Sequence, residues 1–555
     1  MLSFPNINLK KYGEKLSLEY SWGHNLKENI LHFFFQLIRD PELSDLELQL
    51  HLMLKKLNLI DKVPQSIQEE AILLYTLIGH TRDIRDGKGE YMLAYMQLWV
   101  WYQYEPVLAQ FALTQFVQGS KYGSWKDIKL FCEYILQKTN NEEHPFILFA
   151  SNLLAMQLKA DMNRFKKKEP ISKAAKWCPR EKTRFKWLYT QLALQIYPEF
   201  IATAKTCSSR AMAICKAKIY LRKELAKMNK YLKTPEYIMC NDTWDNLTYQ
   251  DISTKALNKY KLAFQNKTKH DTTRHNQIGR YICAAKLQHF IESEPKARTN
   301  SLNVGELVKA ALSCRTALDE KIVNTLWNNN ITKNTHLENV IPIIDTSSSM
   351  ERNHLEPLYN AIGLGIRVSE ISWGAFKNRL IIFSANPYWI RFEDDDSFVK
   401  KVRYIYGMLR GLNSNIQAVI KMLIDALKEA KTPIADIKTL TLLFFSDMQC
   451  DPFSEFNGFC LSDNIKKKFI KFFHTIPKIV FWNMRKTGGF PALIYDRNLI
   501  MLSGTNAKIL NILTPRDTVK TPLSTSIFNG PYSSLYKLLN SKRYLILKNK
   551  IISKI

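Results

Sequence analysis

The apolar run Val340-Ile341-Pro342-Ile343-Ile344 leads directly into Asp345-Thr346-Ser347-Ser348-Ser349. A short run of branched apolar residues that ends in turn-forming residues predicts a buried strand. In an open α/β sheet, the residues that follow such a strand face the crevice where ligands bind. Carboxylate and hydroxyl oxygens are the ligands that hard divalent cations such as Mg²⁺ prefer. The segment therefore indicates a metal-binding loop, although Asp and Ser at such positions also commonly begin the next helix.

Two later segments can supply the additional oxygen ligands that such a loop needs. A second apolar run, residues 440–445, ends in Ser446 and Asp447, and the turn at 411–417 offers the hydroxyl of Ser414. Strand patterns at 379–384, 438–445 and 478–482 alternate with a helical pattern at 418–431. This alternation predicts a doubly wound, mostly parallel sheet with helices on both faces.

With these loops in place, residues 336–515 resemble the von Willebrand factor A domain with its metal-ion-dependent adhesion site. The resemblance implies that Mg²⁺, or another hard divalent cation, is the cofactor, and that an acidic residue of a protein partner completes its coordination. The residues that it assigns to the metal are Asp345, Ser347, Ser349, Ser414 and Asp447. Ser414 stands where the family has a Thr, so it keeps the hydroxyl but lacks the methyl group that restricts the rotamer.

Other segments resemble an uncharacterised family of eukaryotes and large DNA viruses. They are HTRDIRDGKGE at 80–90, YGSWKD at 122–127, AAKWCP at 174–179, MCNDTW at 239–244, FWNMR at 481–485 and LSG at 502–504. The chain is more distantly similar to the Ro autoantigen, in which helical repeats form a ring that binds RNA and an A domain closes the ring. These resemblances imply an architecture, and the function has to be argued from the site.

The chain has 555 residues, which exceeds the usual limit of about 250–300 residues for a single hydrophobic core. Apolar residues recur at helical spacing in 46–57, 67–78, 92–102, 107–117, 128–136, 146–156 and 184–196. We therefore expect a HEAT-like helical-repeat domain at 1–335. An A-like α/β domain at 336–515 and a C-terminal tail at 516–555, which packs back on the helical domain, complete the predicted α plus α/β fold.

The net charge of +28 is concentrated in the helical half. Residues 156–298 hold 30 Lys and Arg against 12 Asp and Glu, a net of +18, whereas residues 338–515 hold 22 against 17. A basic excess of this size attracts polyanions, and RNA is the expected candidate. The alternative is that the lysines only form a solvated surface, because a charge excess alone does not establish nucleic-acid binding.

Two basic segments are the candidate nucleic-acid contacts. Their residues are Arg82, Arg85, Lys88, Lys166, Lys167, Lys168, Lys173, Lys176 and Arg180. The first segment lacks the spacing of a phosphate-binding loop, and the favoured interpretation is an interhelix turn in which Gly87 and Gly89 take positive φ. In the second segment, Trp177 and Trp187 lie among the cations. Such rings can stack on bases, but anchoring in the core is the favoured interpretation.

Several function classes are not supported by the residues. Nine cysteines without a Cys-x-x-Cys pair indicate reduced thiols and an intracellular protein, cytoplasmic or nuclear. We identify no secretory leader, and the most apolar stretch, 91–117, is interrupted by Pro106 and polar residues, so no membrane contact is expected. The histidines lack metal-ligand spacing, and no catalytic base or phosphate cradle accompanies the acidic loops.

The expected function is therefore a non-enzymatic binding scaffold. It would use a Mg-dependent adhesion site for a protein partner and a basic helical surface for RNA. The alternatives are a module that binds only protein and a metal-dependent phosphoester hydrolase.

Overall fold

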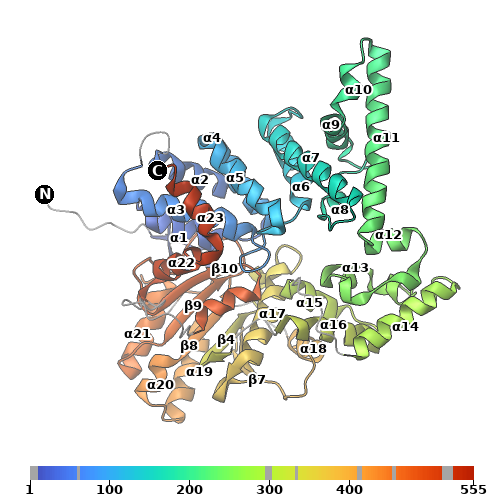
Figure 1. Ribbon diagram of the computed structural model, residues 1–555. Helices are drawn as coiled ribbons and strands as arrows, with labels where there is room; N and C mark the ends of the chain where they lie inside the picture. Colours follow the sequence, from blue (N-terminus) through green and yellow to red (C-terminus); the bar gives the residue numbers. More distant parts are fainter. Residues whose placement is uncertain are drawn as a thin grey trace.

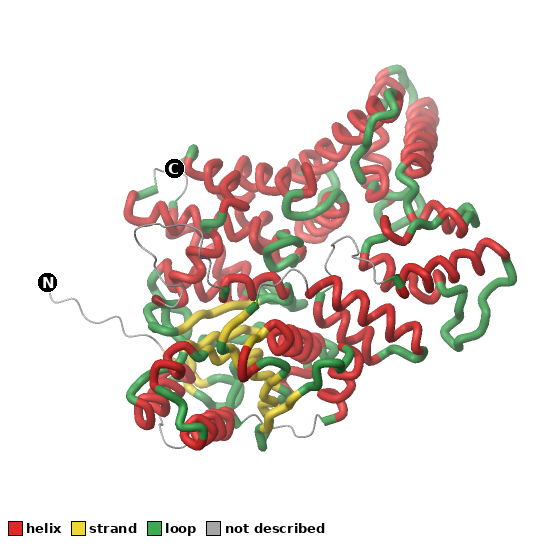
Figure 2. The backbone as a smooth tube through the Cα atoms, turned by 60° about the horizontal axis from the view of Figure 1, so that its bottom comes forward, coloured by secondary structure: helices red, strands yellow, loops and turns green. Residues whose placement is uncertain are grey.

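The computed structural model consists of an arc of helices and a six-stranded sheet (Figure 1). The arc begins and ends beside the sheet. The structure describes residues 10–58, 63–293, 303–331, 336–408, 415–452, 458–514 and 529–555. Figure 2 shows the strands gathered at one side of the molecule, with helices forming the remainder. This arrangement confirms the predicted combination of a helical N-terminal region with a C-terminal, mostly parallel α/β sheet.

The large sheet has the strand order β10-β9-β8-β4-β6-β7. Its strands are β4 Val340–Asp345, β6 Arg379–Phe383, β7 Tyr388–Arg391, β8 Thr441–Ser446, β9 Lys478–Asn483 and β10 Leu499–Ser503. All neighbouring strands are parallel except β6 and β7. The strand β4 pairs with β6 on one side and β8 on the other, so the order reverses at β4, where ligands bind in open sheets.

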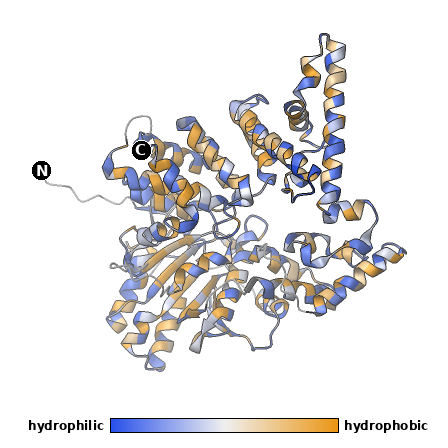
Figure 3. Ribbon diagram, in the orientation of Figure 1, coloured by the Kyte–Doolittle hydropathy of each residue, from blue (hydrophilic) through white to orange (hydrophobic). Residues whose placement is uncertain are grey.

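Helices cover both faces of this sheet. They are α17 Glu356–Ile371, α18 Phe398–Gly407, α19 Ile416–Glu429, α20 Ile434–Thr439 and α21 Leu461–Phe473. Ile344 packs so closely under α17 that a side chain at Gly365 would collide with it. Ile341, on the opposite face of the same strand, lines a cavity of about 770 Å³ together with Leu423 of α19. The strands are largely apolar, as the hydropathy colours show (Figure 3), and polar residues such as Asp345 and Ser446 stand at their carboxyl ends.

Each predicted helical stretch of the N-terminal half coincides with a helix, although those predicted from residues 67 and 184 begin as α-helix only at Gln68 and Lys186. The first of these helices are α1 Leu26–Gln36, α2 Ser44–Leu57, α3 Gln68–Arg82, α4 Tyr91–Tyr104, α5 Pro106–Val117 and α6 Lys126–Thr139. They continue as α7 Pro145–Lys166, α8 Ala174–Trp177, α9 Lys186–Ile196, α10 Pro198–Ala202, α11 Cys207–Tyr231 and α12 Pro235–Cys240. Helices close in sequence contact one another, for example α4 with α5 and α6 with α7, as in a helical array.

The arc then returns to the sheet. Its last helices are α13 Thr254–Phe264, α14 Ile278–Glu292, α15 Val304–Leu312 and α16 Ala317–Ile331. α15 packs against α17, and a side chain at Gly363 would meet Val304, so the two helices approach closely. At the other end of the arc, α1 contacts β10. Both ends of the helical half are thus anchored on the sheet.

The two ends of the described chain lie against other parts of the molecule. The C-terminal helices α22 Pro531–Leu539 and α23 Leu545–Ile552 both pack against α3. The N-terminal strands β1 Lys10–Tyr12 and β2 Leu18–Tyr20 form a hairpin, and Tyr20 pairs with Phe490 of the sheet domain. Among the described residues, no helix is both long and apolar enough to cross a membrane. All nine cysteines lie in the described ranges and are free thiols.

Candidate metal-binding site

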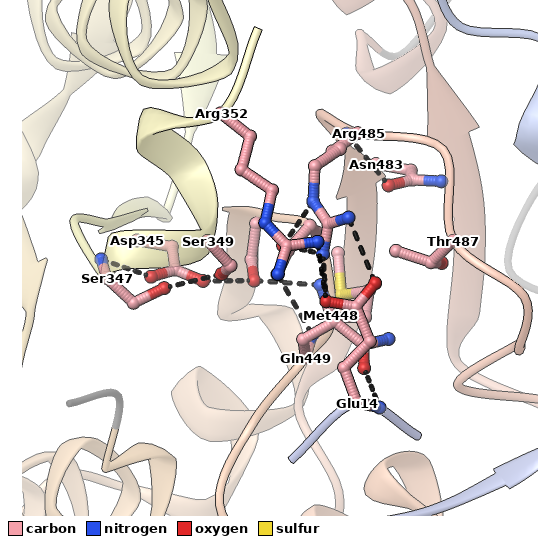
Figure 4. A network of polar contacts seen from close by, with 12 residues as sticks. Glu14, Asp345, Ser347, Ser349, Arg352, Met448, Gln449, Asn483, Arg485 and Thr487 are labelled. Atoms are coloured by element: carbon pink, nitrogen blue, oxygen red, sulfur yellow. Dashed lines mark hydrogen bonds and ion pairs between the residues drawn. The ribbon is translucent and has the colours of Figure 1, made fainter. Parts of the chain in front are cut away.

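The first acidic loop brings its oxygen atoms together at the end of β4 (Figure 4). One carboxylate oxygen of Asp345 accepts a hydrogen bond from the backbone N–H of Ser347 at 2.9 Å. The hydroxyls of Ser347 and Ser349 lie 3.0 Å apart. Asp345 and Ser347 are fully buried, and Ser349 is 6% exposed. The Asp-x-Ser-x-Ser spacing therefore produces a compact set of oxygen donors.

The third loop meets the first because β8 lies next to β4. The other carboxylate oxygen of Asp345 accepts from the Ser446 hydroxyl at 2.5 Å. Asp447 is fully buried, and its Oδ1 accepts from the backbone N–H of Gln449 at 3.0 Å. Burial raises the pKa of Asp345 to about 6, and the negative charge of Asp447 contributes to the shift. A cation near both carboxylates would relieve this repulsion.

Ser414, the predicted ligand of the second loop, lies outside the described residues. The four other predicted ligands are in described loops, at the carboxyl ends of β4 and β8.

Arg485 is a member of this network that the sequence argument missed. It follows β9, the neighbour of β8, and its Nε donates to Asp447 Oδ2 at 2.9 Å. Its Nη1 and Nη2 donate to the two carboxylate oxygens of Glu14 at 3.0 and 2.9 Å. The position of Arg485 could have been inferred, since it closely follows the predicted strand 478–482 at the same sheet edge. Glu14, in contrast, lies at the other end of the chain, where no local pattern points to this site.

The donor set fits a hard divalent cation. Asp345 and Asp447 carry two negative charges, and Arg485 supplies one positive charge. Hydroxyl oxygens from Ser347 and Ser349 complete the described donors, a chemistry that suits Mg²⁺ and not a soft metal. The described residues contain no cluster of three His, Cys, Asp or Glu, so the described donor set consists of two carboxylates and two hydroxyls.

The structure corrects the prediction that Lys88 contacts a polyanion. Lys88 is 2% exposed, and its Nζ donates to the carbonyls of Phe34 and Leu37 at 2.5 and 3.0 Å and to the Ser503 hydroxyl at 2.6 Å. Burial holds the pKa of its ammonium group well below the usual range. Lys88 therefore joins α1 and β10 inside the protein and is not available to a nucleic acid.

Arg82 is also buried, and the prediction for it is corrected in the same way. Its Nε and Nη2 donate to the two oxygens of Asp127, both at 2.8 Å, and the Tyr95 hydroxyl donates to Asp127 at 2.6 Å. The favoured interpretation of segment 82–90, an interhelix turn, agrees with this pairing and with the positive φ of Gly89. Gly87 does not take a positive φ, contrary to expectation. It is glycine because a side chain there would collide with the carbonyl of His80. Only Arg85 of the three predicted cations is exposed.

The second basic segment lies at the surface. Its exposed members are Lys166, Lys167, Lys168, Lys173 and Arg180. Lys176 is half-buried and lies 3.0 Å from Glu236, so it is partly neutralised. Trp177 and Trp187 are half-buried and pack against the core, which supports the interpretation that they anchor helices. The neighbouring helix α11 adds the exposed cations Arg210, Lys216, Arg222, Lys223, Lys227 and Lys230.

Both halves of the chain match families without an assigned function. Residues 132–282 match Domain of unknown function (DUF2828), and residues 339–525 match Domain of unknown function (DUF7788). An uncharacterised protein of Acanthamoeba polyphaga mimivirus, L728, is 25% identical over 506 residues, which cover 87% of this chain and 81% of that protein. The chain is thus similar to uncharacterised proteins that include one from a large DNA virus.

Among solved structures, the crystal structure of Deinococcus radiodurans Ro (RSR) protein is similar. The match covers 88% of this chain and 100% of that chain, with 11% sequence identity and a TM-score of 0.41. At this level the similarity carries no argument about function. Neither of the two matching families is named as a von Willebrand factor A domain, so the comparisons do not show that narrower assignment.

Proposed function

We propose that the protein is a non-enzymatic binding scaffold whose sheet domain grips an acidic residue of a protein partner through Mg²⁺. The observation that carries this proposal is the convergence of Asp345, Ser347, Ser349 and Asp447 at the switch point of the sheet. In this proposal, Ser414 is the ligand from the second loop. A bound Mg²⁺ would offer a coordination position to a carboxylate, and the oxygens of this chain would fix where that position points.

The surroundings of the site favour binding over hydrolysis. A hydrolase needs a general base that is free to take a proton from water. The carboxylates of this network are Asp345, Asp447, Glu14 and Glu19, the last of which lies in β2 and accepts from the side chain of Gln449 at 2.5 Å. Each of the other three also accepts a hydrogen bond. These contacts hold the four carboxylates in fixed positions, as a binding site requires. The proposal is therefore a recognition site rather than a phosphoester hydrolase.

The exposed basic surface on α7, α8 and α11 supports a second part of the proposal, the binding of RNA. On α11, Arg210, Lys223 and Lys230 have no acidic partner among the described residues, so their charges are available to phosphates. In Figure 1, α11 lies at the far side of the arc from the sheet. A protein partner at the metal loops and an RNA on this surface would thus occupy separate regions.

Calorimetric titration of Mg²⁺ tests the metal part. Wild-type protein should give a saturable heat of binding, and Asp345→Ala should lose that heat, because one of two charged ligands is removed. Asp395→Ala is the matched control, since Asp395 is an exposed acid in another loop of the same domain. Identical heats from wild type and Asp345→Ala would refute the metal part.

Recovery of the native complex from cells tests the partners. A protein partner at the metal loops should survive nuclease and be lost on treatment with EDTA. RNA should crosslink to wild type and less to a variant with Lys166, Lys167 and Lys168 changed to Glu, and its binding should weaken with salt. The control changes the exposed Lys55, Lys56 and Lys421 to Glu. Equal RNA recovery from both triple variants would contradict binding at this surface.

A further inference from the structure

The N-terminal hairpin carries a glutamate to the edge of the candidate metal site. Its turn is closed by a hydrogen bond from Gly13 N–H to the Ser17 carbonyl at 2.8 Å, and Glu14 lies at this tip. The hairpin is attached to the sheet domain through Tyr20, which exchanges two backbone hydrogen bonds with Phe490 at 3.0 and 2.9 Å. The backbone N–H of Glu14 also donates to the side chain of Gln449, in the loop of Asp447, at 2.7 Å.

Two arginines hold the carboxylate of Glu14 (Figure 4). Arg485 binds both oxygens, at 3.0 and 2.9 Å, in the bidentate geometry that guanidinium and carboxylate prefer. Arg352, directly after the first metal loop, lies 3.2 Å from one of these oxygens. Burial raises the pKa of Glu14, but the hydrogen bonds and charge of Arg485, together with Arg352, outweigh it and lower the pKa. Glu14 is thus held as an anion.

The groups around the site carry more positive charge than Glu14 alone neutralises. With a divalent cation bound, Asp345 and Asp447 are neutralised, and the two positive charges of Arg485 and Arg352 remain. Glu14 balances one of them, and Glu19 balances the other only in part, because burial raises the pKa of its carboxyl to about 7. A partner that presents several carboxylates would therefore match this region better than a neutral partner would.

The exposed fractions of the side chains show which member of this ion pair can be displaced by a partner. The Arg485 side chain is only 6% exposed and is fixed by Asp447, whereas the side chain of Glu14 is 41% exposed. The strands β1 and β2 have three residues each, and a two-stranded hairpin of this size has little stability of its own. The side chain of Glu14 can therefore leave while Arg485 stays in place, and the exposed Arg352 can follow an incoming carboxylate.

We propose that Arg485 and Arg352 form a carboxylate subsite for an acidic peptide segment, and that Glu14 fills this subsite in the free protein as an internal competitor. The part of the proposal that concerns the partner rests on the proposed function: one acidic side chain of the segment binds the metal, and a neighbouring one displaces Glu14. Because Glu14 is tethered, its effective concentration is in the millimolar range, and a partner must outcompete it. The hairpin thereby selects for partners with more than one carboxylate.

The subsite can be tested without metal by chemical rescue. In EDTA, 50 mM acetate should raise the melting temperature of Glu14→Ala relative to the same concentration of chloride, because acetate occupies the vacated position. Wild type should show no such difference, and neither should the control Glu47→Ala, which removes a glutamate from a surface ion pair with Lys138. Equal effects of acetate and chloride on Glu14→Ala would overturn the subsite.

The competition is tested with a fluorescein-labelled tetraglutamate peptide, whose binding is followed by anisotropy in Mg²⁺. Glu14→Gln keeps the size of the side chain and should bind about tenfold more tightly than wild type, since the tethered competitor loses its charge. Glu47→Gln should stay within about twofold of wild type. An unchanged affinity of Glu14→Gln, or no binding by it, would overturn the competition. If acetate rescues Glu14→Ala but tetraglutamate binding is insensitive to EDTA, the proposed metal function fails while the subsite stands.

Discussion

Arg485 donates from Nε to Oδ2 of Asp447 at 2.9 Å, so the acidic residue that follows β8 already has a cationic partner. Asp447 is fully buried, and a buried carboxylate without a partner is strongly destabilising. Arg485 therefore stabilises the acidic loop after β8 without a bound cation. At the same time it adds a positive charge next to the position where Mg²⁺ would sit.

In a variant with Arg485 replaced by methionine, Mg²⁺ should take over the neutralisation of Asp447 that Arg485 provides in the wild type. In EDTA, Arg485→Met should lose about 3 kcal/mol of stability, because Asp447 and Glu14 both lose their buried partner. Mg²⁺ should then raise the melting temperature of the variant more than that of wild type, since the variant site has one negative charge more to neutralise. Differential scanning fluorimetry with and without 5 mM Mg²⁺ measures both effects.

The matched control for this experiment is Arg352→Met. Arg352 is 60% exposed, and its acidic partner among the described residues is the half-exposed Glu14, so its loss should change stability by less than about 1 kcal/mol. Equal Mg²⁺ shifts in wild type and Arg485→Met would show that the cation does not bind near Asp447.

The strands and the acidic loops could be predicted because their signals are local. Residues 340–344 and 478–482 are short apolar runs, and they form β4 and β9 within a residue of the predicted bounds. The run predicted from residue 438 begins as a strand only at Thr441, because Ile434–Thr439 forms α20. The edge strand β7 was not predicted, since four residues carry too little pattern.

The contacts of charged side chains could not be predicted in the same way. Lys88 and Lys166 look alike in the sequence, yet Lys88 is buried against carbonyls of α1 and the hydroxyl of Ser503, while Lys166 is exposed. Those partners lie far away in the chain, so burial of a lysine depends on the assembled fold. For the same reason, the contact of Glu14 with Arg485 could not be predicted, because Glu14 reaches that residue only once the hairpin pairs with Phe490.

Lys88→Met should destabilise the protein although it replaces a buried cation with an apolar side chain of similar length. The carbonyls of Phe34 and Leu37 lose a donor near the end of α1, and an unsatisfied buried acceptor costs about 1–3 kcal/mol. We expect a loss of about 2–4 kcal/mol in urea unfolding. Arg85→Met, an exposed cation three residues earlier, should change stability by less than about 0.5 kcal/mol. A loss from Lys88→Met no larger than that of the control would contradict this role.

Asp127→Asn should break the link between the segment 80–90 and α6. Asp127 accepts from Arg82 through two hydrogen bonds of 2.8 Å and from Tyr95 at 2.6 Å, and all three side chains are buried. Removing one partner of a buried ion pair costs about 3–5 kcal/mol, because the other charge stays buried without compensation. Thermal unfolding followed by circular dichroism measures the loss. Glu133→Gln in the same helix, which pairs with the exposed Arg184, is the control and should cost less than about 1 kcal/mol.

His32 should make the protein sensitive to acid. Burial lowers the pKa of His32 from 6.5 to about 3, and its ring stacks on Phe490 with 3.6 Å between the ring centroids. Above pH 6.5 the ring is neutral in both states, and its contribution to stability is complete. As the pH falls from 6.5 toward 3, only the unfolded state takes up the proton, so stability decreases, by about 2 kcal/mol at pH 5. In urea unfolding at pH 7 and pH 5, His32→Phe should lose less stability than wild type. The exposed-site control His24→Phe should keep the wild-type difference, and an equal difference in His32→Phe would refute the assignment.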